Sequence, residues 1–383
     1  MVSPMLLKRL ADAVGIAYEL LFADETDQAS KVELLPPRPL LVVGRDKDFV
    51  TIIERFKTDL QTSECSVQAI TAVRGWPGVG KTTTAAALLY RPEVREMFPH
   101  GTLWISLGQA PDLQRLLHQW ARALGDTACT VINDVEEVSR RIAGRLSNQR
   151  MLLAIDDVWQ SSHARLFLVG GPRCGMLVTT RLPRVAEELT PSPAHRYNLD
   201  VLDEEQATQL LSKLAYSTVT ASPITSRELV RELEGLPLAI VVAGRLLEVE
   251  AQRRLKGEPG RSSVQRLLED IRAGAAALLN APAPADMADL ISQTTPSVAI
   301  LLRKSVEVLD AQTRERFAYL GSFAPKPAIV RLEDMAVVWQ IPTFEAEKTA
   351  VELIDRGLLE PVDEGKFWMH ALIVCLADSL CAE

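Results

Sequence analysis

The sequence predicts an α/β P-loop domain with a parallel five-stranded sheet, followed by an all-α helical domain and a winged-helix domain. Short apolar runs alternate with helical segments as far as Leu202, helical spacing then takes over, and a β-hairpin pattern appears near the end. The 383 residues, 47% of them apolar, can supply several hydrophobic cores. We expect residues 1–36 to form an N-terminal helix and linker, 37–202 the α/β domain, 203–290 the helical domain and 291–383 the winged helix.

The first segment has the apolar spacing of an amphipathic helix. Leu6, Leu10 and Val14 recur every four residues and would share one face. Prolines between residues 36 and 39 then prevent a helix and mark a boundary. In the following LLVVGRDKDF, an apolar strand end that turns at Gly44 could present backbone groups to an adenine, with Arg45 beside it.

Residues 75–83 read GWPGVGKTT and match G-x-x-x-x-G-K-[ST]. Glycines at these places let backbone N–H groups turn inward around a polyphosphate. An apolar strand precedes the loop and a run of helix formers follows it, which is the context that the motif needs. We therefore expect a phosphate cradle at Gly78, Val79 and Gly80, contact of Lys81 with the β- and γ-phosphates, Mg²⁺ binding by Thr82 and a place near the α-phosphate for Thr83.

The alternation of strands and helices continues to Leu202. Helices are expected at residues 112–124 and 135–146, each between two apolar runs. The five expected strands are residues 68–73, 101–109, 151–159, 175–181 and 197–202. Buried parallel strands read as continuous apolar runs of this kind.

Two acids end the expected strand MLLAIDDVW. In open α/β sheets, nucleotides bind at the carboxyl edge, where such a strand delivers its last side chains. Asp156 would hold Mg²⁺ through water, and Asp157 would orient or deprotonate an attacking water. The alternative for Asp157 is a structural role as the cap of the following turn.

A cation ends the next expected strand, GMLVTTR. Arg181 at the carboxyl edge near the P-loop could contact a γ-phosphate and report its presence. The alternative is an ordinary salt bridge with a neighbouring acid.

Helices dominate after Leu202, at about residues 204–214, 226–233 and 236–247. Pro237 would lie at a helix N-terminus, where proline is tolerated. The polar and proline-rich stretches at residues 256–263 and 281–286 read as connectors on either side of a further helix.

The last part of the chain has the pattern of a winged helix. After several helices, residues 358–362 and 366–370 form two extended runs that an Asp-Glu-Gly turn separates. A winged helix often reads DNA, but the helix before this hairpin has an excess of acids, the wrong sign for a DNA groove. By itself, His370 at the next helix start reads as a core histidine.

Composition gives no general attraction to nucleic acid or anionic membranes, because the net charge is −8. The five cysteines form no C-x-x-C pair and read as reduced thiols. No signal peptide and no apolar run long enough to cross a membrane is visible in the sequence. We expect a cytoplasmic protein with no membrane partner.

Taken in order, the motifs closely resemble the NB-ARC family of signal-transducing P-loop ATPases, which includes plant disease-resistance proteins, the apoptosome-forming factor of animals and many bacterial regulators. The matching stretches are VGR at 43–45, GWPGVGKTT at 75–83, LLAIDDVW at 152–159, LVTTR at 177–181, GLPLAI at 235–240 and MH at 369–370. The resemblance covers about residues 40–383. It implies adenine contacts from Val43 and Arg45, packing of Pro237 on the nucleotide, γ-phosphate sensing by Arg181 and contact of His370 with the β-phosphate of ADP.

The chain departs from the family pattern in two places. The family usually has Asp after Met-His, whereas this chain has Ala371, so the closed state would be latched less firmly. The family usually carries an effector domain before the core and a repeat array after it, which are not visible here. We expect effector and sensor domains or partner proteins outside this chain.

The resemblance implies a switch that is closed around ADP when inactive and self-associates when ATP replaces ADP. Binding would be the function, and slow Mg-dependent hydrolysis of ATP would reset it. Members act in innate immunity and apoptosis-like signalling. The alternative is a transcription regulator that binds DNA through the winged helix under nucleotide control. A rapidly cycling ATPase is disfavoured, because a switch that traps nucleotide between domains must release it slowly.

Overall fold

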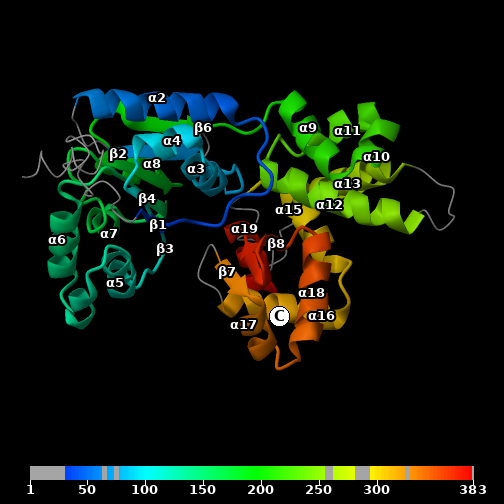
Figure 1. The fold of residues 1–383 in the computed structure, drawn as a ribbon. Coiled ribbons are helices and arrows are strands. Elements are labelled where there is room, and N and C mark those ends of the chain that lie inside the picture. Colours follow the sequence, from blue (N-terminus) through cyan, green and yellow to red (C-terminus); the bar gives the residue numbers. More distant parts are fainter. Residues whose placement is uncertain are drawn as a thin grey trace, which may run out of the picture.

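The computed structural model describes residues 31–62, 67–72, 77–254, 262–280, 294–323 and 328–381 (Figure 1). The helix predicted for the first segment lies outside the described residues, as do the 281–286 connector and most of the 256–263 connector.

A parallel sheet of six strands, in the order β1-β3-β4-β5-β2-β6, forms the first half of the fold. The strands are β1 (Val32–Leu34), β2 (Val67–Ala72), β3 (Gly101–Gly108), β4 (Met151–Val158), β5 (Gly175–Thr180) and β6 (Arg196–Leu199). The prediction of five strands was wrong by one, because β1 pairs at the edge beside β3 and is only three residues long. The expected strand end before Gly44 was also wrong, since residues 40–43 have no regular secondary structure.

Helices cover both faces of this sheet (Figure 1). One face packs against α2 (Asp46–Thr62), α3 (Lys81–Leu89) and α4 (Pro92–Met97). The other packs against α5 (Leu113–Ala123), α6 (Val135–Leu146), α7 (Ser161–Arg165) and α8 (Pro183–Leu189). The short 3-10 helix η3 (Thr127–Val131) lies between α5 and α6, and η4 (Pro193–His195) lies between α8 and β6. Covering on both faces explains why every residue of β4 is buried.

The strand order brings three sequence motifs to one edge. β5 lies between β2, which leads into the P-loop, and β4, which ends in the two acids. All three strands are parallel, so their carboxyl ends meet at the same edge of the sheet. Arg181, the residue after β5, is thereby placed between the P-loop and the acids.

The second region of the structure is helical. It comprises α9 (Glu204–Leu214), α10 (Tyr216–Ala221), α11 (Pro223–Glu232), α12 (Pro237–Arg254) and α13 (Ser263–Asn280). Asp203 begins α9 with a capping box, in which its side chain accepts the Gln206 N–H and the Gln206 side chain accepts the Asp203 N–H. Pro237 is the first residue of α12, as the sequence predicts.

The third region combines helices with a small antiparallel sheet in the order β7-β9-β8. Its elements are α15 (Pro296–Glu307), α16 (Ala311–Phe323), β7 (Ala328–Arg331), α17 (Leu332–Val338), α18 (Thr343–Asp355), β8 (Glu360–Asp363), β9 (Lys366–Met369) and α19 (Ala371–Cys381). The predicted hairpin is confirmed as β8 and β9, with Gly365 at φ 66° in its turn. Pro361 is accommodated because β8 is an edge strand.

A single apolar cluster joins the three regions. It runs from one face of the large sheet through α9 and α12 to α16 and α19. Gly357 lies at a close approach between the second and third regions, because a Cβ there would lie 3.0 Å from the Cα of Val242 in α12. Within the described residues, no helix combines the length and apolar character needed to span a membrane.

Candidate functional site

The described part of the P-loop, from Pro77 onward, has the backbone of an anion cradle. Gly78 and Gly80 have φ of 85° and 99°, in the left-handed region that favours glycine, and Gly80 is the N-cap of α3. A Cβ on Gly78 would lie 3.0 Å from the Cβ of Leu238 in α12. The carbonyl of Gly78 also accepts a backbone hydrogen bond from Leu238 N–H at 3.3 Å. Gly75, the first residue of the motif, lies outside the described residues.

Lys81 begins α3 and is buried between charges of both signs. Burial and, to a smaller extent, the positive charge of Arg181 lower its pKa to about 8, although the carboxylates of Asp157 and Asp156 oppose the shift. A buried ammonium at a helix N-terminus, where the dipole is positive, is an unfavourable arrangement without an anion. An anion bound in the loop would relieve it.

Asp156 lies at the carboxyl end of β4 and is fully buried. Burial, together with the nearby charge of Asp157, raises its pKa to about 6, although hydrogen bonds from Thr179, Thr82 and Ser106 oppose this rise. The Thr179 hydroxyl donates to Asp156 Oδ1 at 2.6 Å, and Ser106 donates to Oδ2 at 3.3 Å. Thr82 and Asp156 therefore offer only oxygen atoms as metal ligands at the P-loop, which fits the ligand preference of Mg²⁺.

Asp157 and Arg181 form an ion pair, with 3.6 Å between Oδ1 and Nε. Asp157 has φ 50° at a β-bulge, and its N–H donates to the Thr179 hydroxyl at 3.0 Å. Its second oxygen, Oδ2, is buried without a hydrogen-bond partner. The Arg181 guanidinium also lies over the Trp159 ring, 5.5 Å from its centroid. The salt bridge that the sequence left as an alternative for Arg181 is thus present, and it leaves one oxygen of Asp157 without a partner.

Two adjoining cavities surround these residues. The smaller is lined by the P-loop, by Asp157 and Arg181, and by His370 from the third region. The larger is lined by Val43 and Arg45, by apolar side chains of α9 and α12 including Leu210 and Val241, and by Pro237. Gly78, Gly80, Thr83, Trp368 and His370 line both cavities. Lys81, Arg181 and the P-loop line the smaller cavity, and apolar side chains predominate in the larger one, an arrangement suited to a ligand with a charged end and a flat apolar end.

His370 immediately precedes α19, and its ring faces the smaller cavity. Its Nδ1 accepts a hydrogen bond from Leu372 N–H at 3.2 Å. Burial, with the positive charges of Arg181 and Lys81, lowers its pKa to about 3. A neutral ring whose Nδ1 is an acceptor carries its proton on Nε2, so His370 can donate one hydrogen bond.

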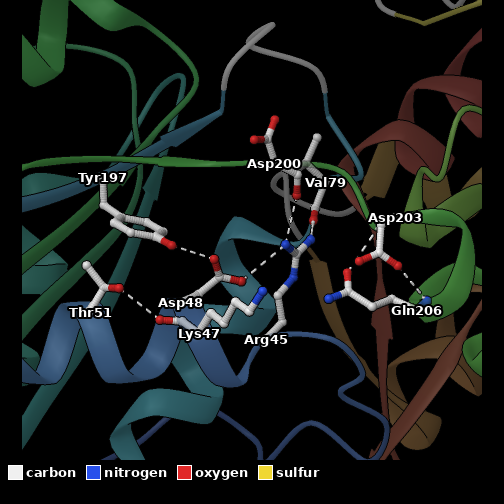
Figure 2. Close-up of polar contacts among 9 residues, drawn as sticks. All are labelled: Arg45, Lys47, Asp48, Thr51, Val79, Tyr197, Asp200, Asp203 and Gln206. Carbon is white, nitrogen blue, oxygen red and sulfur yellow. Dashed lines mark hydrogen bonds and ion pairs between the residues drawn. The ribbon is translucent and has the colours of Figure 1, made fainter.

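Arg45 braces the loop from behind, as Figure 2 shows. Its guanidinium donates to the Val79 carbonyl at 2.6 Å and to the Asp200 carbonyl at 2.8 Å, and it pairs with Asp48 at 3.3 Å. Tyr197 on β6 donates to the other oxygen of Asp48. Burial lowers the pKa of Arg45, and Asp48 opposes that shift. The contacts of Arg45 shown in Figure 2 therefore join the P-loop to the segment that leads into α9.

Sequence reasoning missed several residues of this site. Thr179 and Ser106 hold Asp156, and Trp368, Arg245 and Glu360 line the larger cavity. A polar residue near the end of a buried strand is a signal that could have found Thr179 and Ser106. For Trp368, the only signal in the sequence is the period of two that places it on the same face as His370. For Arg245 and Glu360, the sequence offers no signal.

A parallel sheet with a glycine-rich loop between β2 and α3, and with paired acids at the end of a neighbouring strand, defines the class of P-loop NTPases. Within this class, the model of the NB-ARC domain matches residues 49–220. The chain carries an NB-ARC domain.

Proteins similar to this chain come from bacteria, animals and plants. The regulatory protein AfsR of Streptomyces griseus is 28% identical over 330 residues, which are 85% of this chain and 31% of that protein. Apoptotic protease-activating factor 1 of Danio rerio is 26% identical over 338 residues, 85% of this chain and 24% of that protein. The disease resistance protein ADR1 of Arabidopsis thaliana is 25% identical over 303 residues, 77% of this chain and 32% of that protein. This chain thus spans about a third of these relatives, or less.

Among solved structures, the Orc1 protein of Aeropyrum pernix, in complex with DNA, matches with a TM-score of 0.43 and 16% identity, over 90% of this chain and 94% of that one.

Proposed function

We propose that this protein is an ADP/ATP-dependent switch of the NB-ARC type, closed around ADP when inactive. The observation that supports it most is that His370, from the third region, lines one cavity with the P-loop and Arg181. A ligand held at that place contacts the first and third regions together, so ligand binding and closure are thermodynamically linked. The boundaries expected from the sequence, including the helical domain at 203–290 and the winged helix at 291–383, are part of this proposal.

The phosphates would occupy the smaller cavity. The backbone of Gly78, Val79 and Gly80 would surround them, with Lys81 on the β-phosphate and Thr83 near the α-phosphate. His370 would donate its Nε2 proton to the β-phosphate of ADP. The base would enter the larger cavity beside Val43 and Arg45, with Pro237 packed against the nucleotide; the backbone of Val43 is better placed than the Arg45 side chain, which is engaged with the protein.

Hydrolysis would be slow and would reset the switch. Thr82 and Asp156 would hold Mg²⁺, which neutralises charge on the phosphates when bound. Asp157 would orient or deprotonate the attacking water through its unpaired oxygen. The ion pair with Arg181 engages Oδ1 of Asp157, so this oxygen is not available to a water, which supports a slow step. Arg181 would leave Asp157 to meet a γ-phosphate, and so sense it.

Exchange of ADP for ATP would open the protein. A third phosphate adds charge and volume in the cavity that His370 and Arg181 now line, so ATP favours displacement of the third region. Surfaces freed in this way would allow self-association. The similar proteins include an apoptotic protease-activating factor and a disease resistance protein, which supports a signalling role with effector and sensor partners. The cytoplasm is the proposed location.

A transcription regulator that binds DNA through the third region is the second candidate. The similarity to the regulatory protein AfsR of Streptomyces griseus favours it. The charge of α18 argues against it, because this helix carries four acids and one lysine over Thr343–Asp355. A gel shift at low salt decides between them, and retention of DNA by the ADP-bound or ATP-bound protein would favour the regulator.

The rate of ADP release tests the switch. Replacing His370 by Ala removes the proposed donor to the β-phosphate, and release of a fluorescent ADP analogue should then be about tenfold faster. His195→Ala is a matched control, because this histidine lies in η4, immediately before β6. It is therefore at the amino end of the parallel strands, whereas the P-loop and the acids are at the carboxyl end. Equal release rates in all three proteins would contradict closure of the third region on the nucleotide.

A further inference from the structure

Strand β9 turns one face to the apolar core and the other to the two cavities. Phe367 and Met369 are buried in the core. Trp368 and His370 alternate with them and line both cavities. This period of two is that of a strand, so one face of β9 is committed to the site.

Glu360 lies beside Trp368 on this face. The two residues are direct partners in the antiparallel pairing of β8 and β9. Side chains of such partners are neighbours on the same face, with Cβ atoms about 5 Å apart. Glu360 accordingly lines the larger cavity, whereas Glu364 is an exposed residue of the hairpin turn.

Glu360 differs in charge from the other residues that line the larger cavity. Among the described residues that line the larger cavity, it is the sole acid, and Arg38, Arg45 and Arg245 are the strong cations. Its carboxyl is open to the cavity but crowded by protein, and the resulting desolvation raises its pKa, which the charge of Arg245 opposes. A carboxylate beside an anion site weakens anion binding unless it accepts hydrogen bonds from a neutral part of the ligand.

We propose that Glu360 accepts hydrogen bonds from the ribose hydroxyls of the bound nucleotide, an inference that rests on the function proposed above. His370 and Trp368 line both cavities, whereas Glu360, the cross-strand partner of Trp368, lines only the larger one, so Glu360 lies on the side where the sugar and base of a nucleotide would follow its phosphates. A carboxylate accepts without donating, and two adjacent hydroxyls supply two donors. An acidic residue that binds ribose hydroxyls is also the solution used in other nucleotide sites.

The consequence is that the third region holds the nucleotide at two points, through the phosphate and through the sugar. Closure then depends on the nucleoside as well as on the number of phosphates. A nucleotide without one of the hydroxyls should bind more weakly and also close the protein less completely.

Titration calorimetry with ADP, 2′-deoxy-ADP, 3′-deoxy-ADP and inosine diphosphate tests this inference on the wild type, Glu360→Ala, Glu360→Gln and Glu364→Ala. We expect the wild type and Glu364→Ala to bind ADP about tenfold more tightly than at least one deoxy analogue. In Glu360→Ala this ratio should fall to about one, with Glu360→Gln between the two, since its amide oxygen is a weaker acceptor. Removing a negative charge changes the affinity for every nucleotide alike, and the ratio cancels that effect.

Other outcomes have distinct meanings. A ratio that is the same in Glu360→Ala as in the wild type overturns the inference, and so does a wild type that binds ADP and both deoxy analogues equally. A variant that loses the preference for ADP over inosine diphosphate, while it keeps the preference over the deoxy analogues, would place Glu360 at the base and also overturn it. A folded wild type that binds no ADP contradicts the proposed function itself.

Discussion

Lys81 shows how much of this site depends on one buried charge. Its ammonium has a pKa of about 8 because burial and Arg181 disfavour the charged form. The phosphates of a nucleotide favour the charged form, so binding raises the pKa and takes up a proton above that pH.

The affinity for ADP should therefore decrease as the pH rises through 8, approaching about tenfold per pH unit. Calorimetry between about pH 7.5 and 9.5 measures this slope. Lys81→Ala should bind ADP weakly at every pH and without the slope, because the charge-assisted contact is gone. Lys57→Ala, at an exposed lysine paired with Glu54, should behave like the wild type. A flat profile in the wild type would mean that Lys81 does not contact the phosphates.

Arg45 acts on the P-loop from the protein side. Arg45 reaches Val79, Asp200 and Asp48 from two nitrogens of its planar fork, and a lysine has a single nitrogen, so Arg45→Lys should weaken ADP binding by about tenfold. Tyr197→Phe, which removes only the hydroxyl on Asp48, should have a smaller effect in the same direction. Calorimetry on both variants, with the exposed Arg140→Lys as a control, measures it. If Arg45→Lys binds ADP like the control, the brace has no role in the site.

Among the elements, α19 has the most direct link to the site, because His370 immediately precedes its first residue. The His370 ring accepts from Leu372 N–H, and the His370 carbonyl accepts from Ile373 and Val374 N–H. The ring orientation thus depends on the start of the helix.

Ala371→Asp should slow ADP release, because a carboxylate at the first position of α19 stabilises the helix N-terminus by about 0.3 to 1 kcal/mol and so steadies His370. Melting temperature in saturating ADP and the release rate measure the effect. Ala311→Asp is a comparable change at the first residue of α16, away from the cavities, and should leave ADP release unaltered. Faster or unchanged release in Ala371→Asp would argue that this helix start does not control the histidine.

At this scale the sequence was a good guide to elements with strong periodicity or a motif. The bounds of α6 and α9 agree with the predictions, and β4 and its acids lie where the apolar run ends. β1 was missed because a three-residue edge strand is recognised only by its pairing with β3. The sequence does not predict the order of the strands either, since this order arises from long-range pairing. Without it, Arg181 was expected near the P-loop, but its place between the P-loop and the acids was not predicted. Glu360 and Trp368 escaped notice because their role follows from how the third region packs.

On the scale of the whole molecule, the packing of the third region on α12 decides whether His370 reaches the phosphates. Gly357 has φ 71°, and a Cβ there would be 3.0 Å from Val242 Cα. Gly125 has a similar φ of 76° but nothing within 4 Å of an added Cβ.

Gly357→Ala should loosen this contact and accelerate ADP release by several-fold, whereas Gly125→Ala shares the backbone strain of about 1 kcal/mol without the contact. The difference between the two variants isolates the interface, and stopped-flow release of a fluorescent ADP analogue measures it. Identical rates would show that the approach of Gly357 to α12 does not govern closure.

The central claim is that the three regions enclose ADP, and the nucleotide carried through purification tests it most directly. Heat denaturation of the purified protein, followed by chromatography of the supernatant, should give about one ADP per chain, since slow release retains the ligand. Lys81→Ala prepared in parallel should give little or none. A folded wild-type protein that yields no nucleotide, and that also fails to take up added ADP, would contradict the account.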